Sequence, residues 1–218
     1  MSLAGVRILI SAGPTFEDLD PVRFIGNRSS GKMGFAIAQA AAARGAQVVL
    51  VAGPVSLPTP AGVIRVDVRS AAQMHAAVMD AMPCDVYIGA AAVADFTPRQ
   101  VAPGKIKKQA GMETLVLELV RTPDILAAVA VHPQRPRLVV GFAAETEHVE
   151  QYARDKLQRK RLDLIAANRV GLAGSGFESD DNALVVYGRD GFERALGPAA
   201  KTDLAHGLLD LVDGCLSA

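Results

Sequence analysis

The segments Val6-Arg-Ile-Leu-Ile-Ser-Ala12 and Gln47-Val-Val-Leu-Val-Ala52 flank the alanine-rich run Gly31-Lys-Met-Gly-Phe-Ala-Ile-Ala-Gln-Ala-Ala-Ala-Ala-Arg44. The two outer segments are short and almost continuously apolar, which is typical of strands buried on both faces of a parallel sheet. The central run consists of strong helix formers with helical spacing of its apolar positions. A strand, a helix and a strand in this order predict a right-handed crossover within an α/β fold.

The same alternation continues along the chain and predicts a doubly wound, mainly parallel, Rossmann-like sheet. Two segments interrupt it, a long connection over Gly13–Ser30 and a loop rich in Pro, Gly and Lys that we expect to act as a flap over about 94–115. A hairpin and a final helix are expected over about 178–216, within a single domain of residues 1–218. The further predicted strands are Val63–Val68, Asp85–Ala90, Arg137–Phe142, Asp163–Ala167 and Ala183–Tyr187 with a partner after Gly191, and the further helices are Ala71–Met82, Pro123–His132, Glu147–Leu162 and Lys201–Cys215.

Several residues mark the predicted helix ends. Ser70 is placed to cap the helix that starts at Ala71, and Gly45 follows the first helix as a left-handed terminator would. Thr122 precedes Pro123, which we expect at the first helical position.

Composition limits the classes of function. The 218 residues are 50% hydrophobic, and 23 Lys and Arg balance 23 Asp and Glu. The zero net charge gives no global reason to expect nucleic acid or an acidic membrane as a partner. Two distant cysteines and no uninterrupted apolar stretch of about 18 residues lead us to expect a cytoplasmic protein.

The segment Gly26-Asn-Arg-Ser-Ser-Gly-Lys32 matches the pattern G-x-x-x-x-G-K but is not a P-loop. Met33 stands where a P-loop needs Ser or Thr, and a long connection separates the segment from the first strand. Ser29, Ser30 and Gly31 still lie where the first turn of a helix presents its N–H groups to an anion. The alternative, with equal weight, is that Ser30 only caps the helix. A dinucleotide fingerprint is absent after the first strand, where Pro14 blocks a tight turn.

Other candidate groups lie after predicted strands or on a predicted helix. Gly89-Ala-Ala-Ala-Val-Ala-Asp95 ends a strand with small residues and one carboxylate, although packing and turn capping explain it equally well. Lys105, Lys107 and Lys108 occupy the flap, and Lys156 and Lys160 share one helix face. Solvated surface lysines are the alternative for both groups. Phe142 is either a ring at the ligand edge of the sheet or plain core, and the four histidines have no metal-ligand spacing.

Taken together, these stretches resemble the phosphopantothenoylcysteine synthetases, in the bacterial form that is usually fused behind a flavin-dependent decarboxylase. The resemblance runs in order from about Val6 to Tyr187. Its stretches are Ile10–Thr15, Leu19–Ile25, Asn27–Gly34, Val51–Pro60, Ala90–Asp95, Lys105–Lys108, Thr122–Ile125, Val140–Thr146 and Asp181–Ala183. Arg28 stands where the family has histidine, and Gly26 where it has serine or a similar residue.

The resemblance implies a ligase with two steps. The carboxylate of 4'-phosphopantothenate attacks CTP to form an acyl-cytidylate and pyrophosphate, and the amine of L-cysteine then displaces CMP. Mg²⁺ is expected on the triphosphate with no dedicated protein cage, and no flavin is expected in this portion. A homodimer is implied, with part of each site completed by the second subunit. The decarboxylase half is absent from the chain, and its Met-Ser-Leu start favours an excised C-terminal part over a free-standing synthetase.

The resemblance also assigns site residues. Asn27, Lys105 and Arg23 are implied as catalytic, with Asn27 acting in the cysteine step and Lys105 on the activated phosphate. The implied nucleotide-binding residues are Gly89, Ala90, Ala91, Asp95, Lys105, Pro123, Asp124, Ile125, Leu126, Phe142, Lys156 and Lys160. The implied phosphopantothenate-binding residues are Asn27, Ser29, Ser30, Gly31 and Lys32. The residues themselves leave two rival functions open, an NAD(P)-dependent reductase and a non-catalytic nucleotide-binding or dimerisation module.

Overall fold

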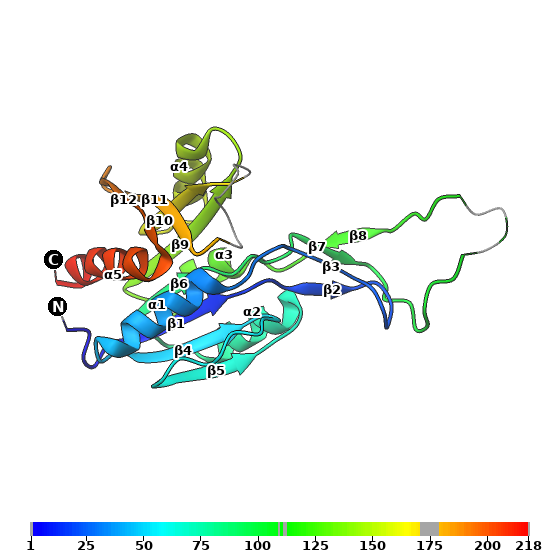
Figure 1. Ribbon diagram of the computed structural model, residues 1–218, viewed down its shortest axis with the longest axis horizontal. Coiled ribbons are helices and arrows are strands. Elements are labelled where there is room, and N and C mark those ends of the chain that lie inside the picture. Colours follow the sequence, from blue (N-terminus) through cyan, green and yellow to red (C-terminus); the bar gives the residue numbers. More distant parts are fainter. Residues whose placement is uncertain (1, 109, 111–112, 171–178, 218) are drawn as a thin grey trace.

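An eight-stranded sheet forms the centre of the body, and helices cover both of its faces (Figure 1). The computed structural model describes residues 2–108, 110, 113–170 and 179–217. The strand order is β12-β11-β10-β9-β6-β1-β4-β5, and the pairs from β10 to β5 are all parallel. β11 and β12 add an antiparallel hairpin at one edge. The order therefore reverses between β1 and β6, as in a Rossmann-like fold.

The main strands are β1 (Arg7–Ala12), β4 (Gln47–Ala52), β5 (Val63–Asp67), β6 (Val86–Gly89), β9 (Leu138–Glu145), β10 (Leu164–Arg169), β11 (Asp181–Gly188) and β12 (Glu193–Ala200). The helices are α1 (Lys32–Ala43), α2 (Ala71–Asp80), α3 (Ile125–Ala130), α4 (Val149–Arg159) and α5 (Lys201–Ser217). The predicted doubly wound α/β fold with its C-terminal hairpin and helix is confirmed. Of the predicted segments, residues 109, 111, 112 and 178 lie outside the described part of the chain.

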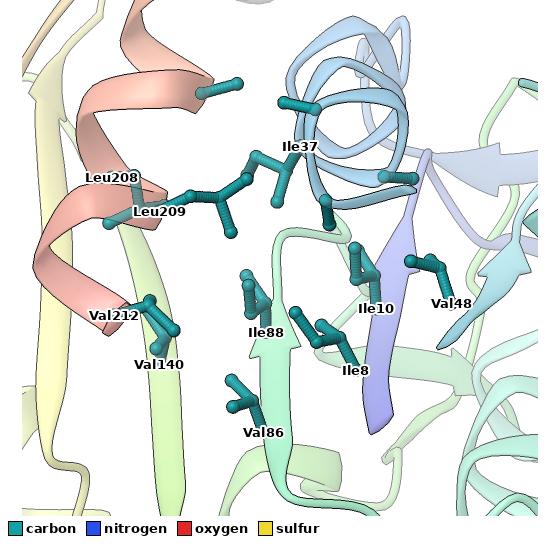
Figure 2. Packing of buried hydrophobic residues seen from close by; sticks show 14 of the residues in the cluster. Ile8, Ile10, Ile37, Val48, Val86, Ile88, Val140, Leu208, Leu209 and Val212 are labelled. Carbon is teal, nitrogen blue, oxygen red and sulfur yellow. The ribbon is translucent and has the colours of Figure 1, made fainter. Parts of the chain in front are cut away.

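The apolar runs are continuous because successive side chains enter two different cores. Ile8 and Ile10 belong to the core beneath α1 and α5, which also contains Ile37 of α1 and Leu209 of α5 (Figure 2). Leu9, between them in sequence, belongs to a second core beneath α2, α3 and α4. A strand with apolar side chains on both faces fits only a sheet that is covered on both sides.

Two antiparallel strand pairs leave the body as a long arm (Figure 1). β2 (Phe16–Asp18) pairs with β3 (Phe24–Gly26), and β7 (Phe96–Pro98) pairs with β8 (Leu119–Arg121). The long connection over Gly13–Ser30 therefore contains a β-hairpin that was not predicted from its sequence.

The predicted helix ends are partly right. Ser70 forms a capping box with Gln73, and Gly45 follows α1 with φ +87°, both as predicted. The placement of Thr122 and Pro123 is wrong, because α3 starts at Ile125 and Asp124 caps it by accepting a hydrogen bond from the N–H of Ala127.

Two residues that could have capped helices, Thr122 and Ser30, do not do so. The Thr122 hydroxyl donates instead to the carbonyl of Ala94 at 2.6 Å. Ser30 does not cap α1 either, since Gly31 occupies that position in the left-handed conformation and no side chain caps the helix.

Close contact between α1 and β1 gives a first prediction. A Cβ atom at Gly34 would lie 2.4 Å from Cβ of Ala12, so Gly34→Ala should lower the free energy of unfolding by about 1–3 kcal/mol through overpacking. The matched control is Gly214→Ala in α5, where an added Cβ has nothing within 4 Å. Helix propensity should make that control more stable by up to about 1 kcal/mol. Urea denaturation measures both, and equal responses would contradict the close-packing argument.

Candidate functional site

Two adjoining cavities lie beyond the carboxyl ends of the central strands, next to the point where the strand order reverses. The first encloses about 430 Å³ and the second about 230 Å³. Both are lined by Ala91, Val93, Asp95 and Lys156, so these residues form a common wall. Open α/β sheets bind ligands at this crevice.

At the common wall the chain after β6 consists mostly of small residues and follows the end of β1 closely. The N–H of Ala90 donates to the carbonyl of Ser11 and the N–H of Ala92 donates to the carbonyl of Gly13, each at 2.9 Å. At Gly89 a Cβ atom would meet Cδ2 of Leu126 at 2.9 Å. Backbone groups therefore lie near the surface of both cavities, where a ligand can approach them.

Most of the predicted nucleotide-binding residues line the first cavity. They are Gly89, Ala91, Asp95, Pro123, Asp124, Ile125, Leu126, Lys156 and Lys160. Ala90 and Phe142 line the second cavity instead. Ser11 and Tyr87 also line the first cavity, where their hydroxyls form a hydrogen bond of 2.9 Å, and neither was among the predicted site residues. Two hydroxyls inside otherwise apolar strands were the signal available for them.

The first cavity has more basic than acidic groups. Arg121, Arg159, Lys156 and Lys160 face Asp95 and Asp124. Lys156 donates to the carbonyl of Phe142 at 2.8 Å, and burial, with the nearby Lys160 charge, lowers the pKa of its ammonium. This local excess of positive charge suits an anionic ligand although the whole chain has no net charge.

Asp124 ties the end of α4 to the start of α3. Its carboxylate lies 3.0 Å from the Lys160 ammonium and also caps α3. Burial opposes its ionisation, but the N–H of Ala127 and the Lys160 ammonium outweigh that effect and lower the pKa of Asp124. Asp124 is therefore ionised at neutral pH and orients Lys160.

The second cavity contains the predicted phosphopantothenate-binding residues Ser29, Ser30, Gly31 and Lys32. It also contains Asn168, Asn182 and Lys201, which the sequence analysis missed. Lys201 is buried at the start of α5, and burial together with Lys32 lowers the pKa of its ammonium. Asn168 is a polar residue near the end of the otherwise apolar strand β10, which was the signal available for it, whereas Lys201 reaches the cavity only through the folding of α5 onto the sheet.

None of the three residues predicted as catalytic is among the lining residues of these two cavities in the described part of the chain. Asn27 donates its side-chain N–H to the carbonyl of Ala92 at 2.9 Å, next to the common wall. Arg23 and Lys105 lie on the arm, where Arg23 pairs with Asp20 and Lys105 is exposed. The structure therefore brings the two predicted ligand groups together but leaves Lys105 outside them.

The described residues contain neither a candidate metal-binding cluster nor a candidate membrane-spanning helix. No group of three or more His, Cys, Asp or Glu side chains in that part of the chain could hold a metal ion. In the same residues, no helix has the length and apolar character needed to cross a membrane.

The fold and the cavities define a Rossmann-like α/β protein with a two-part, basic site at the switch point of its sheet. The chain belongs to the family of the DNA/pantothenate metabolism flavoprotein C-terminal domain, whose model matches residues 3–215.

Two curated proteins are similar in sequence to this chain over almost its whole length. The chain is 54% identical over 211 residues to the coenzyme A biosynthesis bifunctional protein CoaBC of Vibrio cholerae, covering 96% of this chain and 53% of that protein. It is also 54% identical over 210 residues to CoaBC of Escherichia coli, covering 95% and 52%. The chain thus spans about half the length of these relatives.

Solved structures show the same fold. The C-terminal domain of a CoaBC protein matches with a TM-score of 0.84 and 41% identity, covering 99% of this chain and 97% of that one. A mutant of Cab2 in complex with phosphopantothenate-cysteine matches with a TM-score of 0.77 at 16% identity, covering 97% and 88%, and so supports the fold alone.

The Asp124–Lys160 pair gives a second prediction. In Lys160→Met the pKa of Asp124 should rise, because a cation that favours the carboxylate is removed. A lowered carboxyl pKa stabilises the fold above the unfolded-state pKa of about 3.9, and this stability is lost as pH falls through the folded-state pKa. The variant should therefore lose up to about 1 kcal/mol of stability at neutral pH and little at pH 2. Carboxyl NMR titration measures the pKa, and an unchanged value would refute the coupling.

Proposed function

We propose that this chain joins 4'-phosphopantothenate to L-cysteine at the expense of CTP, releasing CMP and pyrophosphate. The observation that carries the proposal is the pair of cavities with a common wall, because a ligase must hold two anionic substrates side by side. Two CoaBC relatives that are 54% identical are named for coenzyme A biosynthesis, which supports this choice.

In this proposal CTP occupies the first cavity. Pro123, Asp124, Ile125 and Leu126 surround the base and ribose, and Lys156 and Lys160 face the phosphates, since all six residues line that cavity. Backbone groups at Gly89–Ala91 allow close approach of the nucleotide. Asp95, on the common wall, is placed for a hydroxyl or an amino group of either substrate.

4'-Phosphopantothenate occupies the second cavity. Its phosphate faces the N-terminus of α1, at Lys32 and the preceding residues Ser29, Ser30 and Gly31, and its carboxylate faces the common wall. Asn27, held by the carbonyl of Ala92, borders that wall and is assigned to the acyl-nucleotide and the cysteine step. The missed residue Lys201 adds a second cation at the same cavity.

The chemistry takes place between bound ligands. A carboxylate oxygen of 4'-phosphopantothenate attacks the α-phosphorus of CTP, the bond to the β-phosphate oxygen breaks, and pyrophosphate leaves. The amine of cysteine then attacks the acyl carbon, loses a proton, and CMP leaves with the bonding electrons. Both steps place negative charge on oxygen, which ammonium and N–H groups stabilise. Cys84 is unsuited as a nucleophile, because burial raises the pKa of its thiol to about 12.

We also propose that Mg²⁺ binds together with CTP, coordinated mainly by the triphosphate. Asp95 and Asp124 are the carboxylates of the first cavity, and Lys160 already pairs with Asp124. This donor set suits an ion that phosphates and water hold for the most part. When bound, the ion would neutralise charge on the leaving pyrophosphate.

We also propose that the chain acts as a homodimer through its arm. Val101, Leu115, Val116 and Leu119 are exposed apolar residues of the arm, and Val116 is 89% exposed. Such a surface favours a protein partner. A second copy would bring the exposed flap residue Lys105 to the site of its neighbour. In the proposal a flavin-dependent decarboxylase, fused to or associated with this chain in the cytoplasm, takes the product.

The reaction itself gives a third prediction. Purified protein with CTP and Mg²⁺ should release pyrophosphate only when 4'-phosphopantothenate is added, and it should release CMP when cysteine is also present. Turnover with ATP should be lower than with CTP, and a coupled pyrophosphate assay with the two nucleotides measures the preference. Tight binding of NADPH without any pyrophosphate release would favour the reductase and reject the ligase.

The dimeric site gives a fourth prediction. Lys105→Gln and Lys156→Met should each abolish most activity, because each removes a cation from the activated phosphate. If Lys105 acts across the dimer, mixing the two variants should restore about a quarter of the normal activity, since half of the dimers are mixed and each has one intact site. Activity after subunit exchange measures this, and sedimentation confirms the dimer. A mixture that stays inactive while mixed dimers form would reject action across the dimer.

A further inference from the structure

A buried carboxylate outside both cavities connects two segments of the arm. Asp20, in the turn between β2 and β3, is only 1% exposed. Its oxygens accept hydrogen bonds from the N–H groups of Val22 at 2.7 Å, Arg23 at 2.8 Å and Ile106 at 3.0 Å. The first two contacts close a local turn, but the third reaches 86 residues along the chain to the flap.

Arg23 holds the same flap residue from the other side. Its Nη1 lies 2.7 Å from the Asp20 carboxylate and donates to the carbonyl of Ile106 at 3.0 Å. The N–H and the carbonyl of Ile106 are therefore both bound by one ion pair. A further backbone bond joins the N–H of Ala102 to the carbonyl of Leu19 at 2.9 Å.

These contacts fix one lysine of the flap more tightly than the others. Lys105 lies inside the short segment 102–106, which is tied at Ala102 and at Ile106, whereas Lys107 and Lys108 lie beyond it. Burial opposes ionisation of Asp20, but three N–H donors and Arg23 outweigh that effect and lower its pKa to about 2. The carboxylate therefore remains charged over the working range of pH and holds its partners throughout.

We infer that Asp20 is a positioning residue which, together with Arg23, holds the flap segment 102–106 against the turn between β2 and β3 and so sets the placement of Lys105. We call the contacts of Leu19, Asp20, Arg23, Ala102 and Ile106 the turn–flap clasp. The local contacts to the N–H groups of Val22 and Arg23 are sufficient to form the turn. The bonds to Ile106 are not needed for the turn and serve to hold the flap. The kinetic part of this inference rests on the proposed function of Lys105, and the structural part does not.

The test compares three variants of the full chain. Asp20→Asn keeps the size of the side chain but removes the ion pair, and Arg23→Gln removes the bond to the Ile106 carbonyl from a half-exposed side chain, so it should fold even if Asp20→Asn does not. The matched control is Asp18→Asn, which removes the charge of a nearby, partly exposed carboxylate that pairs with Arg69.

The first measurement is limited trypsin digestion under native conditions, followed by mass spectrometry. Cleavage after Lys105 should be at least about fivefold faster in Asp20→Asn and Arg23→Gln than in the parent and in Asp18→Asn, with sites outside the arm unchanged. Equal cleavage after Lys105 in all four proteins would overturn the clasp, whatever their activity. Faster cleavage at every site would also overturn it, because that result indicates general unfolding.

The second measurement is steady-state pyrophosphate release. Asp20→Asn should lower kcat by about tenfold or more and leave the KM for CTP within about twofold, because a displaced Lys105 weakens the transition state rather than ground-state binding. A selective rise in trypsin cleavage with unchanged kcat would overturn the positioning role. An inactive parent protein would count against the proposed ligase function and would leave the clasp to be decided by trypsin alone.

Discussion

The structure depends on one topological constraint, the reversal of strand order between the parallel neighbours β1 and β6. Right-handed crossovers carry the chain to opposite faces on the two sides of this pair, so α1, which follows β1, and α3, which follows β6, lie on opposite faces of the sheet. The two long excursions of the chain leave from the carboxyl ends of these two strands. They remain side by side through the bridge between Pro14 and Ala92 before they separate into the hairpins of the arm. The cavities and the arm therefore have a common origin in the sheet.

Burial on both faces explains why so much of the body could be predicted from sequence. A strand such as β4 (Gln47–Ala52) is apolar throughout because both cores need it, and its bounds matched the prediction. The arm lacks this signal, since β2 and β3 are short and bury few side chains. The start of α3 was misplaced for a different reason. Both Thr122 and Asp124 can cap a helix, and only the tertiary hydrogen bond to Ala94 shows that Thr122 is engaged elsewhere.

In the candidate site, too, some residues could be predicted from sequence and others depend on tertiary contacts. Residues at or shortly after the end of a strand, such as Gly89 and Ala91 at the end of β6, could be placed at the crevice because parallel strands end at one edge. Lys201 could not, since its place at the second cavity depends on the packing of α5 against the sheet. The turn–flap clasp could not either. Its partners are separated by more than 80 residues, and neither hairpin has a periodicity that predicts their contact.

The lysines of the first cavity are held in place by the protein itself. Lys156 is bound to the Phe142 carbonyl on β9 and Lys160 to the carboxylate that caps α3, so both side chains have lost much of their rotamer freedom before any ligand binds. An anion that enters then meets oriented cations in a partly desolvated space, where charge acts more strongly than on an open surface. Local placement can thus provide what net charge does not. A chain with 23 basic and 23 acidic residues can still present a crevice suited to a polyanion, because a few of its cations converge there while a small excess of acidic residues elsewhere compensates for them.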